Sequence, residues 1–346
     1  MINLDTDHSQ RIEIQNPTPV LAEHKLWPSQ VQHNCKTGSL VETASGDILA
    51  AWYGAEGSVK GNTALWIARN TSGKWQQPEL VRKYEGQNVW NPVFVKKADG
   101  NLALFFRSYY PEGGDTHRYK RSFTYCMIHS SDEGKNWSED TILPQGITGA
   151  SKCSPLILSD TSWLVPSSVP LDNENHRAVL LHTADEGKNW TTYDPIVRED
   201  ATEQMTEPCL VQTKDKTVHI FLRNRQKQEE NRRVMHATFD LATKKVSVAT
   251  PINVENPDTG VDVVCLPDGR LLMAANPCTK GRSPLSLLVS SDNGVNWEKF
   301  MDLETGKGSF SQPALLLAND GKIHAIYSFW HNESHEKNIK HLVLKI

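Results

Sequence analysis

The sequence predicts an all-β protein folded as a six-bladed β-propeller, and two independent internal repeats lead to this prediction. The first is a short turn motif containing Asp, Gly and Trp that returns at a spacing of 53 residues, from Asp132 to Asp185. The second is an apolar strand, a polar turn and another apolar strand. This second unit occurs six times along the 346 residues, and each repeat is long enough for four short strands.

The turn motif reads S-x-D-x-G-x-x-W with small variation. From Asp185 to Asp292 is 107 residues, about twice the first spacing, so the repeat between them carries a degraded copy, expected at 238–240. We expect the Asp to accept backbone N–H groups, the Gly to supply positive φ, and the Trp to pack over the turn. These residues are therefore expected to be structural, not catalytic. The three good copies span 130–137, 183–190 and 290–297, and another degraded copy lies at 70–75.

The six hairpins are runs of β-forming residues closed by Asp-Gly or a similar pair, which is typical of β-turns. No proline-rich linker or charge block interrupts the series, so we expect a single domain over 1–346. The final segment HLVLKI is expected to share a blade with an early strand such as 12–14, which closes the ring and removes exposed sheet edges. The predicted turns centre on Gly46, Gly100, Asp160, Asp215, Gly269 and Gly321, at separations of 54, 60, 55, 54 and 52 residues.

Composition narrows the class of partner. With 37 Lys and Arg against 41 Asp and Glu, the net charge is −4, which argues against nucleic acid or an anionic membrane as the main partner. The start of the chain lacks a signal-peptide pattern, so we expect a cytoplasmic protein, or a secreted one if a leader was removed. Six scattered cysteines without a C-x-x-C pair suggest free thiols, and we expect no metal or cofactor. Composition leaves the oligomeric state open.

The turn motif is similar to the Asp box of sialidases, and the strand pattern from about residue 36 to the C-terminus resembles the sialidase superfamily. This resemblance implies a sialidase-like propeller with three arginines that bind a sugar carboxylate, a tyrosine nucleophile activated by a glutamate, and an aspartate acid/base. Glu207 opens a strand pair that ends in Arg223, which matches the family's glutamate and second arginine. Arg282 lies shortly before the turn of Asp292, which matches the third arginine.

Three positions depart from the family pattern. Lys36 takes the place of the first arginine, which keeps a cation but not a bidentate donor. Asn62 stands where the family has its acid/base aspartate, and Phe310 where it has its tyrosine. With these alignments the covalent mechanism of the family cannot operate.

Because Asn62 and Phe310 cannot transfer protons, other residues near the ends of the predicted inner strands are the candidates for that role. A histidine has a pKa near neutrality and needs no special burial to exchange protons. Arg107, followed by Tyr109 and Tyr110, is a candidate for a sugar subsite, although packing explains the aromatic pair equally well. The acid/base candidates are His33, Glu56, Tyr53, Tyr327 and His331.

The expected function is that of an exo-acting glycoside hydrolase on a terminal carboxylate-bearing sugar, sialic acid-like or uronic. Two alternatives stay open: a lyase acting on uronate-containing glycans, and a carbohydrate-binding propeller without catalysis. Glu207 and Arg223 favour an enzyme, whereas Asn62 and Phe310 favour binding alone. The ends of inner strands face one cavity in a propeller, so we expect the binding and base residues to meet there. That expected cluster consists of Lys36, Glu207, Arg223 and Arg282.

Overall fold

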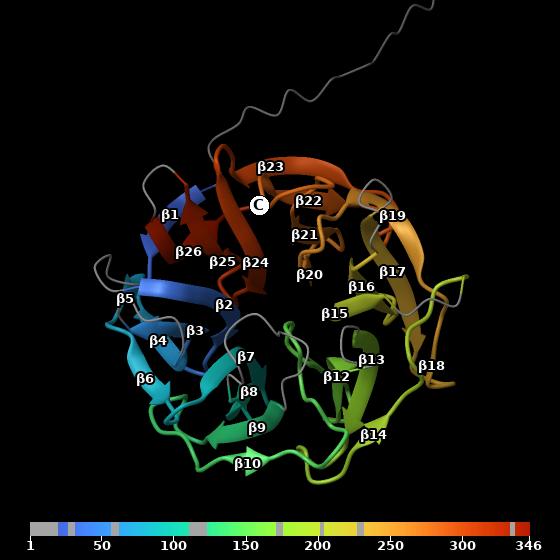
Figure 1. Cartoon of the computed structure of the whole chain (residues 1–346). Helices are drawn as coiled ribbons and strands as arrows, with labels where there is room; N and C mark the ends of the chain where they lie inside the picture. The colour runs from blue at the N-terminus through green and yellow to red at the C-terminus, as the bar shows by residue number, and fades with distance from the viewer. Residues whose placement is uncertain are drawn as a thin grey trace, which may run out of the picture.

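Six antiparallel sheets stand around a central axis in the computed structural model (Figure 1). The structure describes residues 20–26, 32–56, 62–110, 123–170, 176–200, 204–226, 232–332 and 336–346. Within these ranges the side chains of 32–34, Thr37, Glu56 and Glu336 are not described. The sheets follow one another around the ring in chain order, as the predicted propeller requires.

The first three blades run from the axis outward in chain order. Blade 1 holds β2 (Gln32–Glu42), β3 (Ile48–Glu56), β4 (Ala64–Thr71) and β5 (Lys74–Trp75), and β6 (Glu79–Arg82) also pairs with β4. Blade 2 holds β7 (Asn88–Lys96), β8 (Leu102–Tyr109), β9 (Phe123–Ser130) and β10 (Thr141–Ile142). Blade 3 holds β11 (Leu156–Ile157), β12 (Trp163–Pro170), β13 (His176–Thr183) and β14 (Thr191–Thr192).

The other three blades repeat this order. Blade 4 holds β15 (Met205–Gln212), β16 (Val218–Asn224), β17 (Arg233–Asp240) and β18 (Lys245–Val246), and β19 (Thr250–Glu255) also pairs with β17. Blade 5 holds β20 (Asp262–Cys265), β21 (Leu271–Ala275), β22 (Leu285–Ser290) and β23 (Glu298–Glu304). Blade 6 holds β24 (Gly308–Leu317), β25 (Ile323–His331), β26 (Glu336–Leu344) and, as its outer strand, β1 (Val20–Lys25).

Blade 6 joins the two ends of the described chain. Strand β1 pairs with β26 in antiparallel register, from Val20 opposite Leu344 to Lys25 opposite Lys340, and the two strands lie side by side in Figure 1. The predicted closure by the C-terminal strand is confirmed, but its partner is β1. The predicted partner, 12–14, lies outside the described residues.

All six predicted hairpin turns lie between the first and second strands of their blades. Because second strands return toward the start of the first, each blade has a turn end and an opposite end, which we call the mouth. The mouth therefore gathers the beginnings of inner strands, the ends of second strands and the beginnings of third strands. The turns after the third strands lie at the end away from it.

The three Asp boxes adopt the expected turn after the third strand of blades 2, 3 and 5. The Oδ1 atom of Asp132 accepts hydrogen bonds from the backbone N–H of Asn136 at 2.9 Å and from the Ser130 hydroxyl at 2.8 Å. Asp185 and Asp292 make the same two kinds of contact. The Asp boxes are thus turn-closing elements, as predicted, and they lie at the end of the ring away from the mouth.

Glycine is required in these turns for two reasons. Gly134 has φ +81°, and a Cβ there would lie 2.6 Å from Cδ1 of Leu49 in blade 1. The turn of one blade therefore packs directly on the neighbouring blade. This contact is one of several that fill the space between blades with apolar side chains, including Leu49, Phe94 and Leu102, and such burial is the main stabilising contribution to the ring.

Candidate functional site

Three inner strands carry the same irregularity at the mouth. Asn91, Glu207 and Gln312 each precede a proline and have positive φ, at 50°, 51° and 55°. Each lies where strand register shifts against the second strand of its blade. A bulge of this kind re-aims a side chain that a regular strand would hold in the sheet. The sequence carries the signal as Asn-Pro, Glu-Pro and Gln-Pro at the start of apolar strands, a pattern that our sequence analysis did not use.

Glu207 and Arg223 form an ion pair within blade 4. Nη1 of Arg223 lies 2.9 Å from Oε1 of Glu207, and Nε of the same guanidinium lies 2.7 Å from Oδ1 of Asp258. Both residues of the Glu207–Arg223 pair are largely buried, with side-chain exposures of 15% and 14%. Two carboxylates thus balance the charge of the Arg223 guanidinium, and the guanidinium in turn fixes the positions of Glu207 and Asp258.

The second carboxylate oxygen of Glu207, Oε2, is buried and has no hydrogen-bond partner among the described residues. Burial would raise the pKa of Glu207, but the charges of Arg223, Lys152 and Arg107 outweigh burial and lower that pKa. Glu207 is therefore an ionised carboxylate with one free acceptor atom. Such a group can accept a ligand hydroxyl or act as a base.

Arg282 approaches the same cluster from blade 5. It precedes β22, and its carbonyl accepts the backbone N–H of Phe310 at 2.9 Å. Its Nη1 donates to the Ser311 hydroxyl at 3.0 Å, and no carboxylate lies within ion-pair distance among the residues that the structure describes. Burial lowers the pKa of Arg282, and the charge of Arg223 lowers it further, although Glu207 opposes this. Arg282 is thus a cation available to an anion.

Arg107 is a second arginine without a carboxylate partner in the described part of the chain. Its guanidinium carbon lies 4.5 Å from the ring centroid of Phe123 and 5.7 Å from that of Trp90. Its Nε is buried and makes no hydrogen bond to a described residue. Tyr109 packs edge-on against Trp90 at 4.8 Å between centroids, whereas Tyr110 is 61% exposed. Packing therefore accounts for Tyr109.

Lys152 was missed by our sequence analysis and lies at the centre of the ring. Its Nζ donates to the backbone carbonyls of Pro313 at 2.6 Å and Val261 at 3.1 Å, so this blade 3 side chain joins blades 5 and 6. The residue is 7% exposed. Burial disfavours its charged form, yet nearby Cys153, Asp262, Cys209 and Glu207 raise its pKa. Lys152 is therefore a buried cation next to Glu207.

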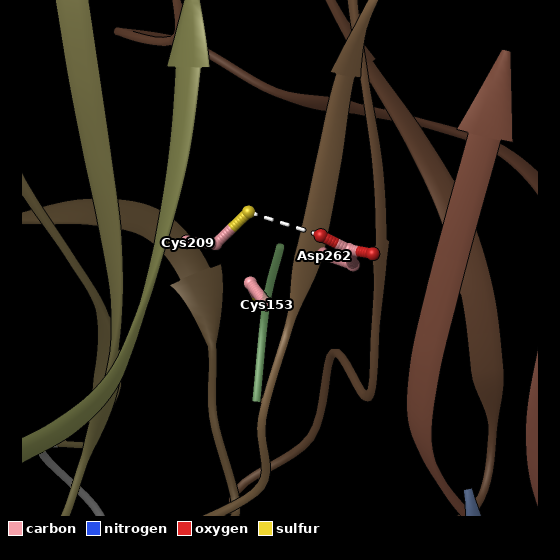
Figure 2. Close-up of side chains that lie close together, drawn as sticks. All are labelled: Cys153, Cys209 and Asp262. Atoms are coloured by element: carbon pink, nitrogen blue, oxygen red, sulfur yellow. Dashed lines mark hydrogen bonds between the residues drawn. The ribbon is translucent and has the colours of Figure 1, made fainter. Parts of the chain in front are cut away.

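Two thiols and a carboxylate lie close together next to the Lys152 segment, and Figure 2 shows their three side chains. Cys153, Cys209 and Asp262 have donor atoms within 4.8 Å of one another, a spacing that a metal ion can bridge. Here the Cys209 thiol donates to Asp262 at 3.0 Å, and Lys152 Nζ lies 3.6 Å from the Cys153 sulfur. Hydrogen bonding to Cys153 and burial raise the pKa of Cys209 well above its usual value. The cluster therefore binds the Lys152 ammonium, whose charge opposes a second cation.

The structure brings together Glu207, Arg223, Arg282 and Arg107. Glu207 and Arg223 are in direct contact, and the charges of these residues shift the pKa values of Glu207 and Arg282. Lys36 stands opposite Tyr53 in the register of β2 and β3. Tyr53 is near enough to Arg282 to raise the pKa of its guanidinium.

At other predicted positions, the side chains make no described contact with this group. Tyr327 is fully buried between blades 5 and 6, and its hydroxyl donates to Glu304 at 2.7 Å. Burial and Glu304 raise its pKa far above the usual value, so proton exchange at Tyr327 is excluded by packing. Asn62 is exposed, and no described hydrogen bond joins it to Glu207. Phe310 is fully buried in the same apolar cluster as Tyr327.

Three further candidates are at strand ends. The side chains of His33 and Glu56 lie outside the described residues, although their backbones belong to β2 and β3. His331 ends β25 and stacks on Phe329, with centroids 6.5 Å apart.

The described part of the chain contains no helix able to cross a membrane.

Comparison with known proteins agrees with this architecture. A family model described as a BNR repeat-like domain matches residues 46–325. A protein of unknown function from Dyadobacter fermentans has a similar structure, with a TM-score of 0.78, 16% identity, and coverage of 94% of this chain and 98% of that one. No curated protein matches significantly.

Solved sialidases have the same fold. The intramolecular trans-sialidase from Ruminococcus gnavus, solved with oseltamivir carboxylate, has a TM-score of 0.70 at 14% identity, with 96% of this chain and 99% of that chain covered. The NanB sialidase of Streptococcus pneumoniae, as its K499G mutant, has a TM-score of 0.72 at 12% identity, with 96% and 71% covered. At identities this low, the comparison shows a shared fold and nothing finer.

Proposed function

The chain belongs to the BNR repeat-like domain family, and from this premise we propose that it is a sialidase-like glycoside hydrolase acting on a terminal carboxylate-bearing sugar. The sugar is sialic acid-like or uronic. The observation that carries the proposal is the pair Arg282 and Arg107, two largely buried guanidiniums at the mouth without a carboxylate partner among the described residues. Arginine binds carboxylates through paired, planar donors, and a ligand carboxylate would supply the missing negative charge.

Charge in the cluster supports an anionic ligand. Arg223 is already balanced by Glu207 and Asp258. Arg282 and Arg107 have no carboxylate partner among the described residues, and burial at the site limits screening of their charge by water. Among the fold neighbours, the Ruminococcus gnavus protein was solved with a carboxylate-containing ligand, which is consistent with this type of recognition.

Glu207 is the residue we assign as base. Its ionised state and free Oε2 suit removal of a proton from an attacking water. We propose Tyr53, one of the acid/base candidates from the sequence, as proton donor to the leaving group: it stands opposite Lys36 in the register of β2 and β3 and lies near enough to Arg282 to raise the pKa of that guanidinium. Glu207, with its lowered pKa, is poorly suited to that acid role.

A lyase is the second candidate, favoured by one observation. Phe310, at the position of the family's nucleophilic tyrosine, is fully buried in an apolar cluster. Elimination from a uronate needs a carboxylate clamp and a base but no glycosyl nucleophile. Arg282 and Glu207 meet those two needs as well as they meet the needs of hydrolysis.

The test is a panel of acidic glycosides, sialosides and uronides, each paired with its neutral analogue. Release of reducing sugar without absorbance of an unsaturated uronate supports hydrolysis. The two signals together support the lyase, because elimination also frees a reducing end. Glu207→Gln should abolish either signal while Arg270→Ala, on the opposite end of blade 5, should not. If calorimetry shows that the acidic members bind but no turnover is detected, the protein is a carbohydrate-binding propeller without catalysis. Equal affinity for acidic and neutral members would overturn carboxylate recognition.

A further inference from the structure

Two cavities lie between blades 2 and 3 at the mouth, and they share wall residues. The inner one has a volume of about 10 Å³ and is lined by Arg107, Asn91 and Ser168 among others. The outer one has a volume of about 470 Å³ and includes Arg177 and Tyr193. Tyr125 and Thr148 line both cavities. We call the two cavities together the trough; their lining residues extend from Arg107, whose charge lowers the pKa of Glu207, to Tyr193 in blade 3.

The inner cavity contains two unsatisfied polar atoms. The hydroxyl of Tyr125 and Nε of Arg107 are both buried, and neither has a hydrogen-bond partner in the described ranges. Tyr125 and Arg107 are cross-strand neighbours in β9 and β8. A buried polar group without a partner is costly, so two adjacent ones at a single cavity indicate an acceptor atom that binds there. The cavity has room for about one such atom with its attached hydrogens, the size of one water.

The outer cavity has the size and wall chemistry of a sugar site. Its volume falls within the usual range of ligand pockets, about 300–1,000 Å³. Val169, Pro170 and Val179 supply apolar wall, while Tyr193 supplies an aromatic ring. Aromatic rings and apolar patches contact the faces of sugar rings, and polar side chains at the margin bind hydroxyls.

We propose that this trough is a second carbohydrate subsite, so that the ligand is an acidic oligosaccharide of at least two sugar units. The terminal acidic unit binds at Arg282 and Glu207. The next unit lies in the outer cavity and places an oxygen in the inner cavity, where it accepts hydrogen bonds from the Tyr125 hydroxyl and from Nε of Arg107. The Nη atoms of Arg107 are then left for the carboxylate of the terminal unit. This inference rests on the proposed function, because it uses the same acidic end unit.

The test compares an acidic monosaccharide with its homodimer in two pairs, N-acetylneuraminic acid with its α2,8-linked dimer and galacturonic acid with its α1,4-linked dimer. Calorimetry is performed in the Glu207→Gln background to prevent turnover. We expect at least one dimer to bind about tenfold or more tightly than its monomer. Tyr125→Phe should reduce that advantage by about three- to tenfold, as for one lost hydrogen bond, and leave monomer affinity unchanged.

Tyr327→Phe is the matched control, because it removes a hydroxyl that does have a partner, Glu304, between blades 5 and 6. We expect Tyr327→Phe to lower the melting temperature without changing dimer affinity. Tyr125→Phe loses no described hydrogen bond, so its melting temperature should stay equal to that of its parent or rise. This contrast separates loss of a ligand contact from loss of fold.

The outcomes distinguish the two proposals. If acidic monomers bind but no dimer binds more tightly, or if Tyr125→Phe leaves the dimer advantage intact, the trough is not a subsite and a buried water satisfies Tyr125. The proposed function would then stand. If neither monomers nor dimers bind better than neutral sugars, the proposed function fails, and the subsite fails with it.

Discussion

Arg223 binds Glu207 through only one of the two carboxylate oxygens, with Nη1 to Oε1 at 2.9 Å, while Oε2 is buried without a described partner. The opposite edge of the same guanidinium binds Asp258. Arg223 therefore fixes the position and charge of Glu207, and its own charge is balanced by two carboxylates. Arg282 and Arg107 have no carboxylate partner among the described residues, and we therefore propose that they, more than Arg223, bind the ligand.

The charge of Glu207 should make folding stability depend on pH in the acid range. Its pKa is lowered in the folded protein, so below its ordinary value of about 4.3 the unfolded chain binds more protons than the folded one. Its contribution is complete above pH 4.3 and is lost as pH falls through the folded pKa. Glu207→Gln should therefore show a weaker loss of stability between pH 5 and 3 in urea unfolding. Identical pH profiles would contradict the ionised, paired state.

Arg282→Ala should weaken binding of an acidic sugar by about 1.5–3 kcal/mol, the usual value for a lost charged hydrogen bond. The fold should be little affected, because Arg282 donates only to Ser311 among the described side chains. Calorimetry and thermal unfolding measure the two effects. Arg270→Ala is the control, since Arg270 pairs with Asp268 at the turn end of the same blade, and it should change neither. An unchanged affinity for Arg282→Ala would remove this residue from the site.

The Trp residues of the Asp boxes should differ in their contribution to stability. Trp297 is 4% exposed, donates to the Gly294 carbonyl at 2.9 Å and packs edge-on against Phe221, so Trp297→Ala should cost about 3–5 kcal/mol. Trp190 makes the equivalent hydrogen bond to Gly187 but is only partly buried. Trp190→Ala should therefore cost less. Urea unfolding of both variants checks the order, and equal losses would show that burial does not decide it.

Histidines at the ring closure should make the protein less stable as pH falls below 6.5. His341 is fully buried, accepts a hydrogen bond from Trp75 in blade 1, and shares one with His324. Burial, with the charges of His324 and His24, lowers its pKa to about 2. The neutral form is the folded one, so stability is complete above 6.5 and falls by about 1.4 kcal/mol for each pH unit below it.

Comparing pH 7.5 with pH 5.5 tests this prediction, because carboxylates such as Glu207 do not titrate in that interval. His341→Gln should be less stable at pH 7.5, having lost its contacts, but should lose less on acidification than the parent. If parent and variant lose the same free energy of unfolding, another group is responsible for the pH dependence.

The architecture was predictable because its signals are local. The turn at Asp132 closes within five residues, using its own Asp, Gly and Asn, and each hairpin turn is written in its own sequence. A local motif repeated at blade spacing gives the number of blades without knowledge of any long-range contact. The strand Val20–Lys25 was not recognised as a partner of the closing strand, because an outer strand exposed on one face has only a weak alternating pattern.

The sequence by itself thus determined the repeat and the blade count. Through the family resemblance it also singled out Glu207, Arg223 and Arg282 as candidate site residues. Only the tertiary structure decided which of these groups are free. It pairs Arg223 with two carboxylates, places Tyr327 in an apolar core, and brings Lys152 of blade 3 to the carbonyls of blades 5 and 6. The physical reason is that charge balance and burial depend on neighbours between 16 and 161 residues away along the chain, and a repeat carries no record of which neighbours those are.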